Sequence, residues 1–187
     1  MRMIAIIDYD AGNIKSVEKA LLSIGETPVL TRDPEVILQA DHIILPGVGS
    51  FGDAMENLHH FGLVPVIHQV VQEQTPFLGI CLGLQLLFEK SEESPGVEGL
   101  GILKGEILRI PAAEGLKIPH MGWNNIRFPN KGRLFAGVPE DAYVYFVHSY
   151  YLKAQDEKIV TATTEYGTHI HASVESGNLF ACQFHPE

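Results

Sequence analysis

Short apolar runs alternate with segments of helical periodicity through the first half of the chain, and this alternation restricts the folds open to it. The strand-like runs lie at residues 3–7, 28–31, 42–45 and 75–80. Helix-like segments lie between or after them, at residues 13–24, 54–60, 63–73 and 82–88. Such alternation is typical of a parallel sheet with helices on both faces. We therefore predict an α/β fold with a mostly parallel central sheet.

The first of these helices has two recognisable ends, and a further short helix has a recognisable start. Asn13 is expected to cap the first helix, and Gly25 is expected to stop it. Asp33 is expected to cap a short helix that begins at Pro34. These ends fall between the apolar runs, as an alternating fold requires.

The second half of the chain is rich in strand-like segments. They are expected at residues 105–110, 125–128, 142–151, 158–164, 170–175 and 179–184. Residues 89–101 are polar and rich in glycine, and we expect a loop there. The strands are predicted to extend the sheet and to add a smaller antiparallel β layer. Because we find no internal repeat, linker or low-complexity tract, we interpret residues 1–187 as a single domain.

Cys81 lies in the string Gly79-Ile80-Cys81-Leu82-Gly83, where an expected strand passes into an expected helix. Small residues two before and two after the sulfur allow a sharp and crowded turn. The positive potential of a helix N-terminus stabilises negative charge on a sulfur placed there. A buried and inert core cysteine is the alternative interpretation. The flanking glycines and the last residues of the chain favour a nucleophile.

His185 and Glu187 follow the strand-like run 179–182. Residues two apart point to the same side of an extended chain, and Pro186 restricts the backbone between them. A carboxylate beside an imidazole holds one ring nitrogen, which leaves the other free to face a thiol. Because Cys81 and His185 both follow expected parallel strands, we predict that they meet beyond the carboxyl ends of these strands.

A glycine-rich loop at residues 46–52 follows another strand-like run. Its three glycines allow unusual backbone angles and bare N–H groups, which can bind an oxyanion. An ordinary turn between a strand and a helix is the alternative. The loop is not of the phosphate-binding type, because no Gly-Lys-Ser/Thr string follows it.

Composition excludes several classes of function. The formal net charge of −10 argues against binding to nucleic acid or to anionic membranes. No apolar stretch approaches the roughly 18 residues of a membrane span. Cys81 and Cys182 are expected to be reduced, because no signal-peptide pattern precedes them, and this indicates a cytoplasmic protein. His169 and His171 share one strand face, but no further ligand accompanies them at metal spacing, so no metal is expected.

At these motifs the sequence resembles the class I, or triad-type, glutamine amidotransferases. The resemblance covers nearly the whole chain, with the strings PGVGSF, GICLGLQ and HPE in the family's order. It implies that Cys81 attacks the side-chain amide of glutamine, that His185 acts as general base and then as general acid, and that Glu187 orients the ring. Family members continue past the position of Glu187 with a basic residue and a short closing segment, so we expect more chain to follow.

The same resemblance implies a set of residues that face the substrate. The N–H of Leu82 and one near Gly49 would form an oxyanion hole, and Gln85 would face glutamine one helical turn after the nucleophile. Ser149 lies in a strand that resembles the family's glutamine-binding edge, where backbone groups make the contacts. Glu93, in the polar loop, is a further candidate contact, with a solvated acidic loop as the alternative.

Three further strings resemble the glutaminase subunit of imidazole glycerol phosphate synthases. They are IDYDAGN near the start, PHMGWN at residues 119–124 and YFVHSY at residues 145–150, and PHMGWN is the most specific of them. In that family this segment and the neighbourhood of Asn13 face the synthase partner. The resemblance therefore implies that Asn13, His120, Met121 and Trp123 are interface residues. Plain packing of Met121 and Trp123 within the fold is the alternative.

The finer resemblance also implies a heterodimer. Ammonia from glutamine would pass to a separate synthase subunit, a (β/α)₈ barrel with cyclase activity, because this chain carries no cyclase domain. The partner would make imidazole glycerol phosphate and an aminoimidazole carboxamide ribotide, a step of histidine biosynthesis. No cofactor is implied, because a thiolate needs none for this reaction. A glutaminase subunit of another amidotransferase complex and a catalytically silent regulatory subunit remain as alternatives.

Overall fold

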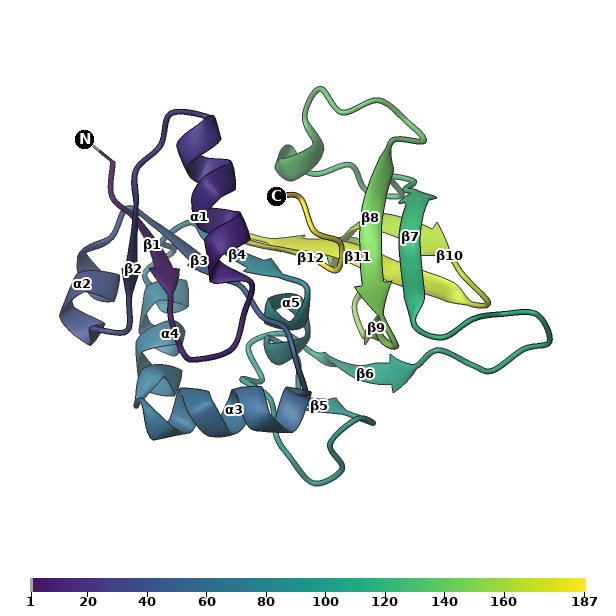
Figure 1. The fold of residues 1–187 in the computed structure, drawn as a ribbon, viewed down its shortest axis with the longest axis horizontal. Coiled ribbons are helices and arrows are strands. Elements are labelled where there is room, and N and C mark those ends of the chain that lie inside the picture. The colour runs from purple at the N-terminus through teal and green to yellow at the C-terminus, as the bar shows by residue number, and fades with distance from the viewer. Residues whose placement is uncertain (1) are drawn as a thin grey trace.

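The first half of the chain forms a parallel sheet by regular alternation of strands and helices, as Figure 1 shows for the computed structural model, which describes residues 2–187. Its strands are β1 (Ile4–Ile7), β2 (Pro28–Thr31), β3 (His42–Leu45) and β4 (Phe77–Ile80). They lie in the order β2-β1-β3-β4 and all run parallel. These short runs are apolar because both faces of the sheet are covered.

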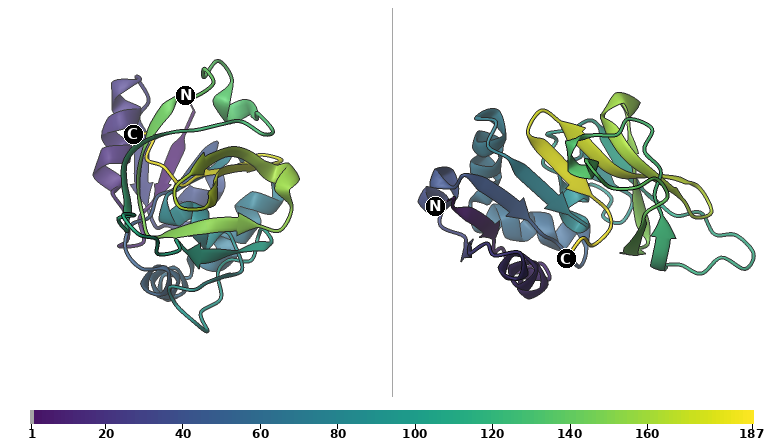
Figure 2. Two further views of the ribbon diagram at one scale, coloured as in Figure 1. Left: turned by 90° about the vertical axis from the view of Figure 1, so that its right-hand side faces the viewer. Right: turned by 90° about the horizontal axis from the view of Figure 1, so that it is seen from above.

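Helices cover this sheet on its two faces. They are α1 (Ile14–Ser23), α2 (Pro34–Gln39), α3 (Phe51–His60), α4 (Leu63–Gln72) and α5 (Leu82–Leu86). One hydrophobic cluster joins the sheet to α2, α3, α4 and α5, and a second joins the opposite face to α1. In the view from above in Figure 2, the strands lie between α1 and α4. The predicted α/β fold with helices on both faces is confirmed.

The second half extends the same sheet with strands that are mostly antiparallel. The strands added are β5 (Lys90–Ser91), β6 (Gly105–Arg109), β9 (Tyr150–Ala154), β10 (Val160–Glu165), β11 (His169–Ser176) and β12 (Leu179–Cys182). The sheet continues from β4 in the order β12-β11-β9-β6-β5, and β10 pairs with β11. The strand that matters for the site is β12, which pairs with β4 in parallel and has Cys182 opposite Ile80.

A separate two-stranded antiparallel sheet lies over part of this extension (Figure 1). It consists of β7 (His120–Asn125) and β8 (Tyr143–His148). Phe146 of β8 is fully buried in the second hydrophobic cluster, together with Phe184. The predicted smaller antiparallel layer is therefore present. Short 3-10 helices complete the structure at Arg133–Phe135 and Glu157–Ile159.

Two predicted strands differ most from the structure, and the strand expected at 158–164 begins only at Val160, after the 3-10 helix Glu157–Ile159. The strand expected at 142–151 is divided into β8 and β9, which belong to different sheets. The chain crosses from one sheet to the other at Ser149. The alternation of buried and exposed side chains ends there, as the two successive buried residues Tyr151 and Leu152 show. The strand expected at 125–128 lies instead at His120–Asn125, where pairing with β8 outweighs the weak strand preference of glycine and asparagine.

The N-terminal cap of α2 is as predicted, whereas that of α1 differs from the prediction. Asp33 accepts a hydrogen bond of 2.9 Å from the backbone N–H of Glu35 and caps α2, as predicted. Asn13 occupies the cap position of α1, but its side chain makes no capping hydrogen bond. Its backbone carbonyl accepts the first helical bonds instead.

Candidate active site

Cys81 forms the sharp turn between β4 and α5. Its backbone adopts φ 55° and ψ −112°, a region that residues with a Cβ rarely enter. The turn is held by a 2.8 Å hydrogen bond from the Cys81 N–H to the carbonyl of Cys182 on the neighbouring strand. The strained turn that the sequence predicts for a nucleophile is thus present at Cys81.

Glycine is required at positions around this turn because there is no space for a Cβ atom. A Cβ added at Gly83 would lie 1.9 Å from the carbonyl oxygen of Leu45, and one added at Gly79 would lie 2.8 Å from the carbonyl oxygen of Gly83. A Cβ at Gly47 would lie 2.7 Å from the hydroxyl of Tyr9. The backbone segments therefore pack against one another directly, and this close packing fixes the position of the sulfur.

His185 and Glu187 lie just beyond the carboxyl end of β12, next to the strand that ends at Cys81. Nδ1 of His185 and Oε1 of Glu187 are 2.9 Å apart, as the His-x-Glu spacing predicts. The backbone N–H of His185 donates to the carbonyl of Tyr145 at 3.0 Å, which ties this segment to β8. The second ring nitrogen of His185, Nε2, is buried and has no hydrogen-bond partner among residues 2–187.

His185 and Glu187 each favour the charged form of the other. The Cys81 sulfur and the Glu187 carboxylate both favour the protonated ring of His185 and raise its pKa above the ordinary value, although burial opposes them. Burial opposes ionisation of Glu187, but its hydrogen bond with His185 lowers the net pKa of this carboxyl group. These shifts favour a protonated ring at His185 that is paired with an ionised carboxylate at Glu187.

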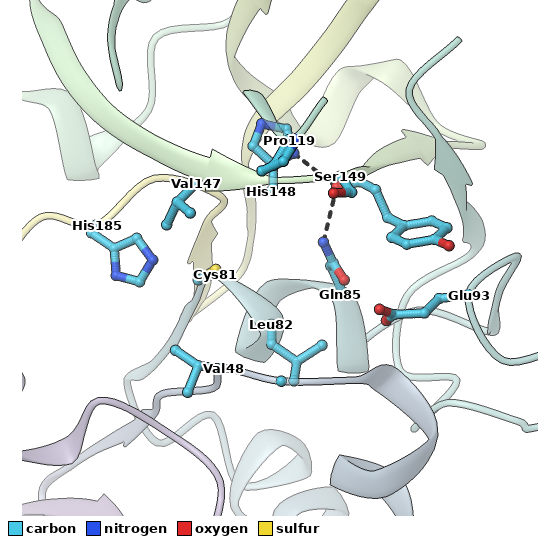
Figure 3. A pocket seen from close by; sticks show the side chains of 12 residues that line it. Val48, Cys81, Leu82, Gln85, Glu93, Pro119, Val147, His148, Ser149 and His185 are labelled. Carbon is cyan, nitrogen blue, oxygen red and sulfur yellow. Dashed lines mark hydrogen bonds between the residues drawn. The ribbon is translucent and has the colours of Figure 1, made fainter. Parts of the chain in front are cut away.

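A cavity of about 360 Å³ opens beside these groups (Figure 3). Both Cys81 and His185 line it. The residues that the resemblance assigns to the substrate also line it: Gly49, Leu82, Gln85, Glu93 and Ser149. Segments far apart in the sequence thus converge at the carboxyl ends of β3, β4 and β12, where open α/β sheets bind ligands.

Several of these lining groups already have partners within the protein. The N–H of Leu82 donates to the carbonyl of Gly47 at 3.3 Å. The Glu93 carboxylate accepts a hydrogen bond of 2.9 Å from the N–H of Phe51, at the start of α3. Nε2 of Gln85 donates to the carbonyl of Tyr150 at 3.1 Å, as the dashed line in Figure 3 shows. This leaves Oε1 as the atom of the Gln85 side chain that is available to a ligand.

The residues expected at a partner surface divide into exposed and buried groups. Met121 and Trp123 are 62% and 70% exposed, and Asn13 is also exposed. Tyr143, which the sequence did not single out, is a third large exposed side chain on the same two-stranded sheet. His120 differs from expectation, because it is only 3% exposed. The alternation of side chains along β7 turns it inward.

Two buried residues of the site were missed from sequence. The hydroxyl of Tyr9 donates to the carbonyl of Pro46 at 2.7 Å and so anchors the glycine-rich loop. The side-chain amide of Gln183 lies 3.7 Å from the Cys81 sulfur. For Gln183 the available signal was its place, one residue after the strand-like run and two before His185.

Other kinds of site are not found in the described part of the chain. No group of three or more His, Cys, Asp and Glu side chains in residues 2–187 is arranged to hold a metal ion. Within the same residues, none of the helices has the length and apolar character needed to cross a membrane. Cys81 and Cys182 are both buried and free of disulfide bonds.

Comparison with known proteins identifies relatives of the whole chain. A family model described as glutamine amidotransferase class-I matches residues 5–187. The imidazole glycerol phosphate synthase subunit HisH of Moorella thermoacetica is 55% identical over 187 residues, which are 100% of this chain and 88% of that protein. The protein of the same name from Aquifex aeolicus is 50% identical over 183 residues, which cover 97% of this chain and 87% of that protein.

Solved structures show the same fold at lower identity. A glutamine amidotransferase crystal structure superposes with a TM-score of 0.75 at 20% identity, over 97% of this chain and 89% of that one. The structure of PurLQS from Thermotoga maritima gives a TM-score of 0.74 at 23% identity, over 99% of this chain and 87% of that one. The family match over residues 5–187 and the level of identity to the HisH proteins lead to one conclusion: this chain belongs to the class I glutamine amidotransferase family.

Proposed function

We propose that this chain is the glutaminase subunit of an imidazole glycerol phosphate synthase, with Cys81, His185 and Glu187 as its catalytic residues. Relatives with this subunit name are 55% and 50% identical to it over nearly its whole length. The observation that carries the catalytic assignment is the strained turn at Cys81, which lines one cavity with His185, whose ring is hydrogen-bonded to Glu187. Nucleophile, acid–base and orienting groups are thereby in place for acyl transfer.

The reaction then proceeds through a thioester. The Cys81 thiolate attacks the carboxamide carbon of glutamine and forms a tetrahedral oxyanion. Protonated His185 donates its proton to the departing nitrogen, so that ammonia leaves and a γ-glutamyl thioester remains on Cys81. His185 then removes a proton from water, which cleaves the thioester to glutamate. The raised pKa of His185 supports its first role, because the ring holds the proton before ammonia departs.

The groups that line the cavity supply binding contacts. Oε1 of Gln85 and the carboxylate of Glu93 are acceptors suited to the α-ammonium group of glutamine, and Ser149 contributes a backbone edge. Leu82 and the region of Gly49 supply the oxyanion donors. Because the N–H of Leu82 is bonded to the carbonyl of Gly47, that bond has to break before this N–H can hold the oxyanion.

The partner is a synthase subunit with a (β/α)₈ barrel, and the two chains form a heterodimer. The exposed Met121 and Trp123 on β7 support an interface there, because such side chains are enriched at the centres of protein–protein interfaces. Asn13 at the start of α1 contributes to it. The partner uses the ammonia to form imidazole glycerol phosphate and an aminoimidazole carboxamide ribotide. A cytoplasmic location and a single domain remain predictions; the ten-stranded sheet that joins both halves of the chain supports the latter.

The experiment is to measure glutamate released from glutamine by this chain alone and with a cyclase subunit and its nucleotide ligand. We expect slow release by the isolated chain and faster release in the complex, because one oxyanion donor is engaged elsewhere in the isolated structure. Equal rates in the two conditions contradict the activation by the partner. No glutamate in either condition contradicts the glutaminase assignment.

A further inference from the structure

Gln183 is fully buried, with 0% of its surface exposed, and it lies against the nucleophile. Its amide nitrogen Nε2 is 3.7 Å from Cys81 Sγ, and its Oε1 accepts a hydrogen bond of 2.9 Å from Nε2 of Gln85. The pairing of β12 with β4 explains the first contact. Cys182 lies opposite Ile80 in parallel strands, so the residues that follow them, Gln183 and Cys81, are neighbours.

The orientation of the Gln183 amide follows from its neighbours. The carbonyl of Tyr150 is only an acceptor, so the end of the Gln85 amide that meets it at 3.1 Å is the NH₂ group. The same NH₂ group meets Gln183, which must therefore present its oxygen there. A reversed Gln183 amide would place two NH₂ groups against each other. The NH₂ group of Gln183 consequently faces the sulfur of Cys81.

The Tyr150 carbonyl is itself held by a chain of side chains from β7 and β8. Nδ1 of His148 lies 2.8 Å from it, a contact that a dashed line marks in Figure 3. Nε2 of His148 lies 3.0 Å from Nδ1 of His120. Nε2 of His120 lies 3.3 Å from the amide nitrogen of Asn124, which also donates to the carbonyl of Glu165. With both rings neutral, every contact pairs one donor with one acceptor. Burial lowers the pKa of both histidines to about 4, which keeps them neutral at neutral pH.

The other polar groups near the sulfur have different roles. Tyr9 donates its hydroxyl proton to a backbone carbonyl, and so does the thiol of Cys182, at 2.7 Å and 3.4 Å respectively. Nε2 of His185 makes no hydrogen bond to the sulfur. Among residues 2–187, Gln183 is the side chain that donates a hydrogen bond to Cys81 Sγ.

We propose that Gln183 is a positioning residue of the glutaminase reaction, whose amide N–H donates to the Cys81 sulfur and stabilises its negative charge before attack. The proposal rests on the proposed function for its place in the reaction. Hydrogen bonds from a neutral amide to an anion are stronger than those between neutral groups. Gln85 acts in the same unit, because it holds the Gln183 amide in the donating orientation.

The first test is the rate at which iodoacetamide alkylates Cys81 in the whole chain. Mass spectrometry of the peptides separates the product at Cys81 from any at Cys182. Gln183→Met removes the donor with little change of volume, and we expect alkylation at neutral pH to slow by about tenfold, as for the loss of a hydrogen bond to a charged group. The control is Gln155→Met at an exposed position, which should leave the rate unchanged. An unchanged rate in Gln183→Met overturns the proposal.

A second variant and a measurement on the unmodified chain guard against misfolding. Gln183→Glu keeps an oxygen for Gln85 but turns a carboxylate oxygen towards the sulfur, so alkylation should be slower than in Gln183→Met; a rate equal to that of the unmodified chain overturns the proposal. In the ¹⁵N-labelled unmodified chain, the Nε2 protons of Gln183 should move to lower field as the sulfur ionises with rising pH. Protons that do not respond also overturn it.

The third test separates a positioning role from a merely structural one. In the complex with a cyclase subunit, Gln183→Met should lower kcat for glutamine hydrolysis about tenfold. KM for glutamine should stay within about twofold, because Gln183 does not line the cavity. A raised KM with unchanged kcat overturns the proposal. If the unmodified chain hydrolyses no glutamine, the proposed function fails, while the alkylation rates still decide the role of Gln183.

Discussion

Cys81 adopts φ 55°, a conformation that costs a residue with a Cβ about 1–3 kcal/mol. The turn persists because backbone bonds surround it: its N–H donates to Cys182, and its carbonyl accepts from Leu84 at 3.0 Å. This turn places Cys81 in the lining of the cavity, although its side chain also packs in the second hydrophobic cluster. Cys182 belongs to the same cluster but does not line this cavity, so the turn at Cys81 distinguishes the proposed nucleophile from Cys182.

Replacement of the nucleophile separates the two activities of the proposed complex. Cys81→Ala should abolish hydrolysis of glutamine, because no other group can form the thioester. Synthesis from added ammonium salts by the partner should continue, because this variant leaves the partner's own chemistry untouched. Both activities are measured in the assembled complex. Loss of both would indicate a misfolded chain or an incorrect assignment.

Gly83 allows a close approach of backbones that no other residue permits. In Gly83→Ala the new methyl group would lie 1.9 Å from the carbonyl oxygen of Leu45, so α5 or β3 has to move. We expect a loss of about 3 kcal/mol in the free energy of unfolding, measured in urea. Gly96→Ala is the comparison, because that glycine has φ +84° but open space around it. Its cost should be about 1 kcal/mol, and an equal loss in both variants would contradict the steric explanation.

At the scale of elements, the site depends on strands that are distant in sequence. β4 and β12 are adjacent and parallel, so the turn at Cys81 and the segment of His185 and Glu187 leave the sheet at the same edge. The pair β7–β8 lies above this edge and is linked to it by the bond from the His185 N–H to Tyr145. The buried His120 of β7 and His148 of β8 join β7 to Tyr150, which lines the cavity.

These histidines make the stability of the chain depend on pH. Burial lowers the pKa of His120 and His148 from 6.5 to about 4, so between these values the unfolded chain binds more protons than the folded chain. Stability should therefore fall as the pH is lowered through this window, by about 1.4 kcal/mol per pH unit for each ring. Urea unfolding measured at neutral pH and near pH 5 gives this slope.

A histidine variant identifies the source of the slope. His148→Gln should flatten the dependence on pH, because one of the two neutral rings is lost. His59→Gln, at an exposed position of α3, is the control and should keep the slope of the unmodified chain. A slope that is the same in all three proteins would show that the buried pair is not responsible.

In the whole molecule, one two-stranded sheet carries exposed apolar side chains and also reaches the cavity. β7 presents Met121 and Trp123 outward, while β8, its partner strand, ends at His148 beside the cavity. The two-stranded sheet therefore connects the proposed partner surface with the proposed glutaminase site. A partner that displaces this sheet would act on His185, whose backbone N–H donates to the carbonyl of Tyr145 on β8.

Trp123 tests the partner surface without disturbing the fold. Because Trp123 is 70% exposed, Trp123→Ala should change the free energy of unfolding by no more than about 0.5 kcal/mol. Binding to the cyclase subunit should weaken by about 2 kcal/mol or more, as for a large aromatic at the centre of an interface. Calorimetric titration measures the affinity, with Val29→Ala on β2 as the control. Unchanged affinity in Trp123→Ala would place the interface elsewhere.

Much of the local structure was predictable from neighbouring residues. The strands β2 and β3, the cap at Asp33 and the Cys81 turn all depend on residues close in sequence, and the structure has them where the pattern predicts. The division of 142–151 between two sheets was not predictable in this way, because it depends on which strands lie opposite each part. Burial of His120 likewise depends on Phe146 and Tyr166, whose rings stack on it.

The amino-acid sequence by itself determined the alternation of strands and helices, the small residues around the nucleophile and the spacing of His185 and Glu187, because these are properties of adjacent positions. Only the tertiary structure decided that β12 lies next to β4, and with it that Gln183 faces a sulfur 102 positions earlier in the chain. Contacts across such a separation arise from the packing and strand order of the whole sheet, and no local pattern encodes them.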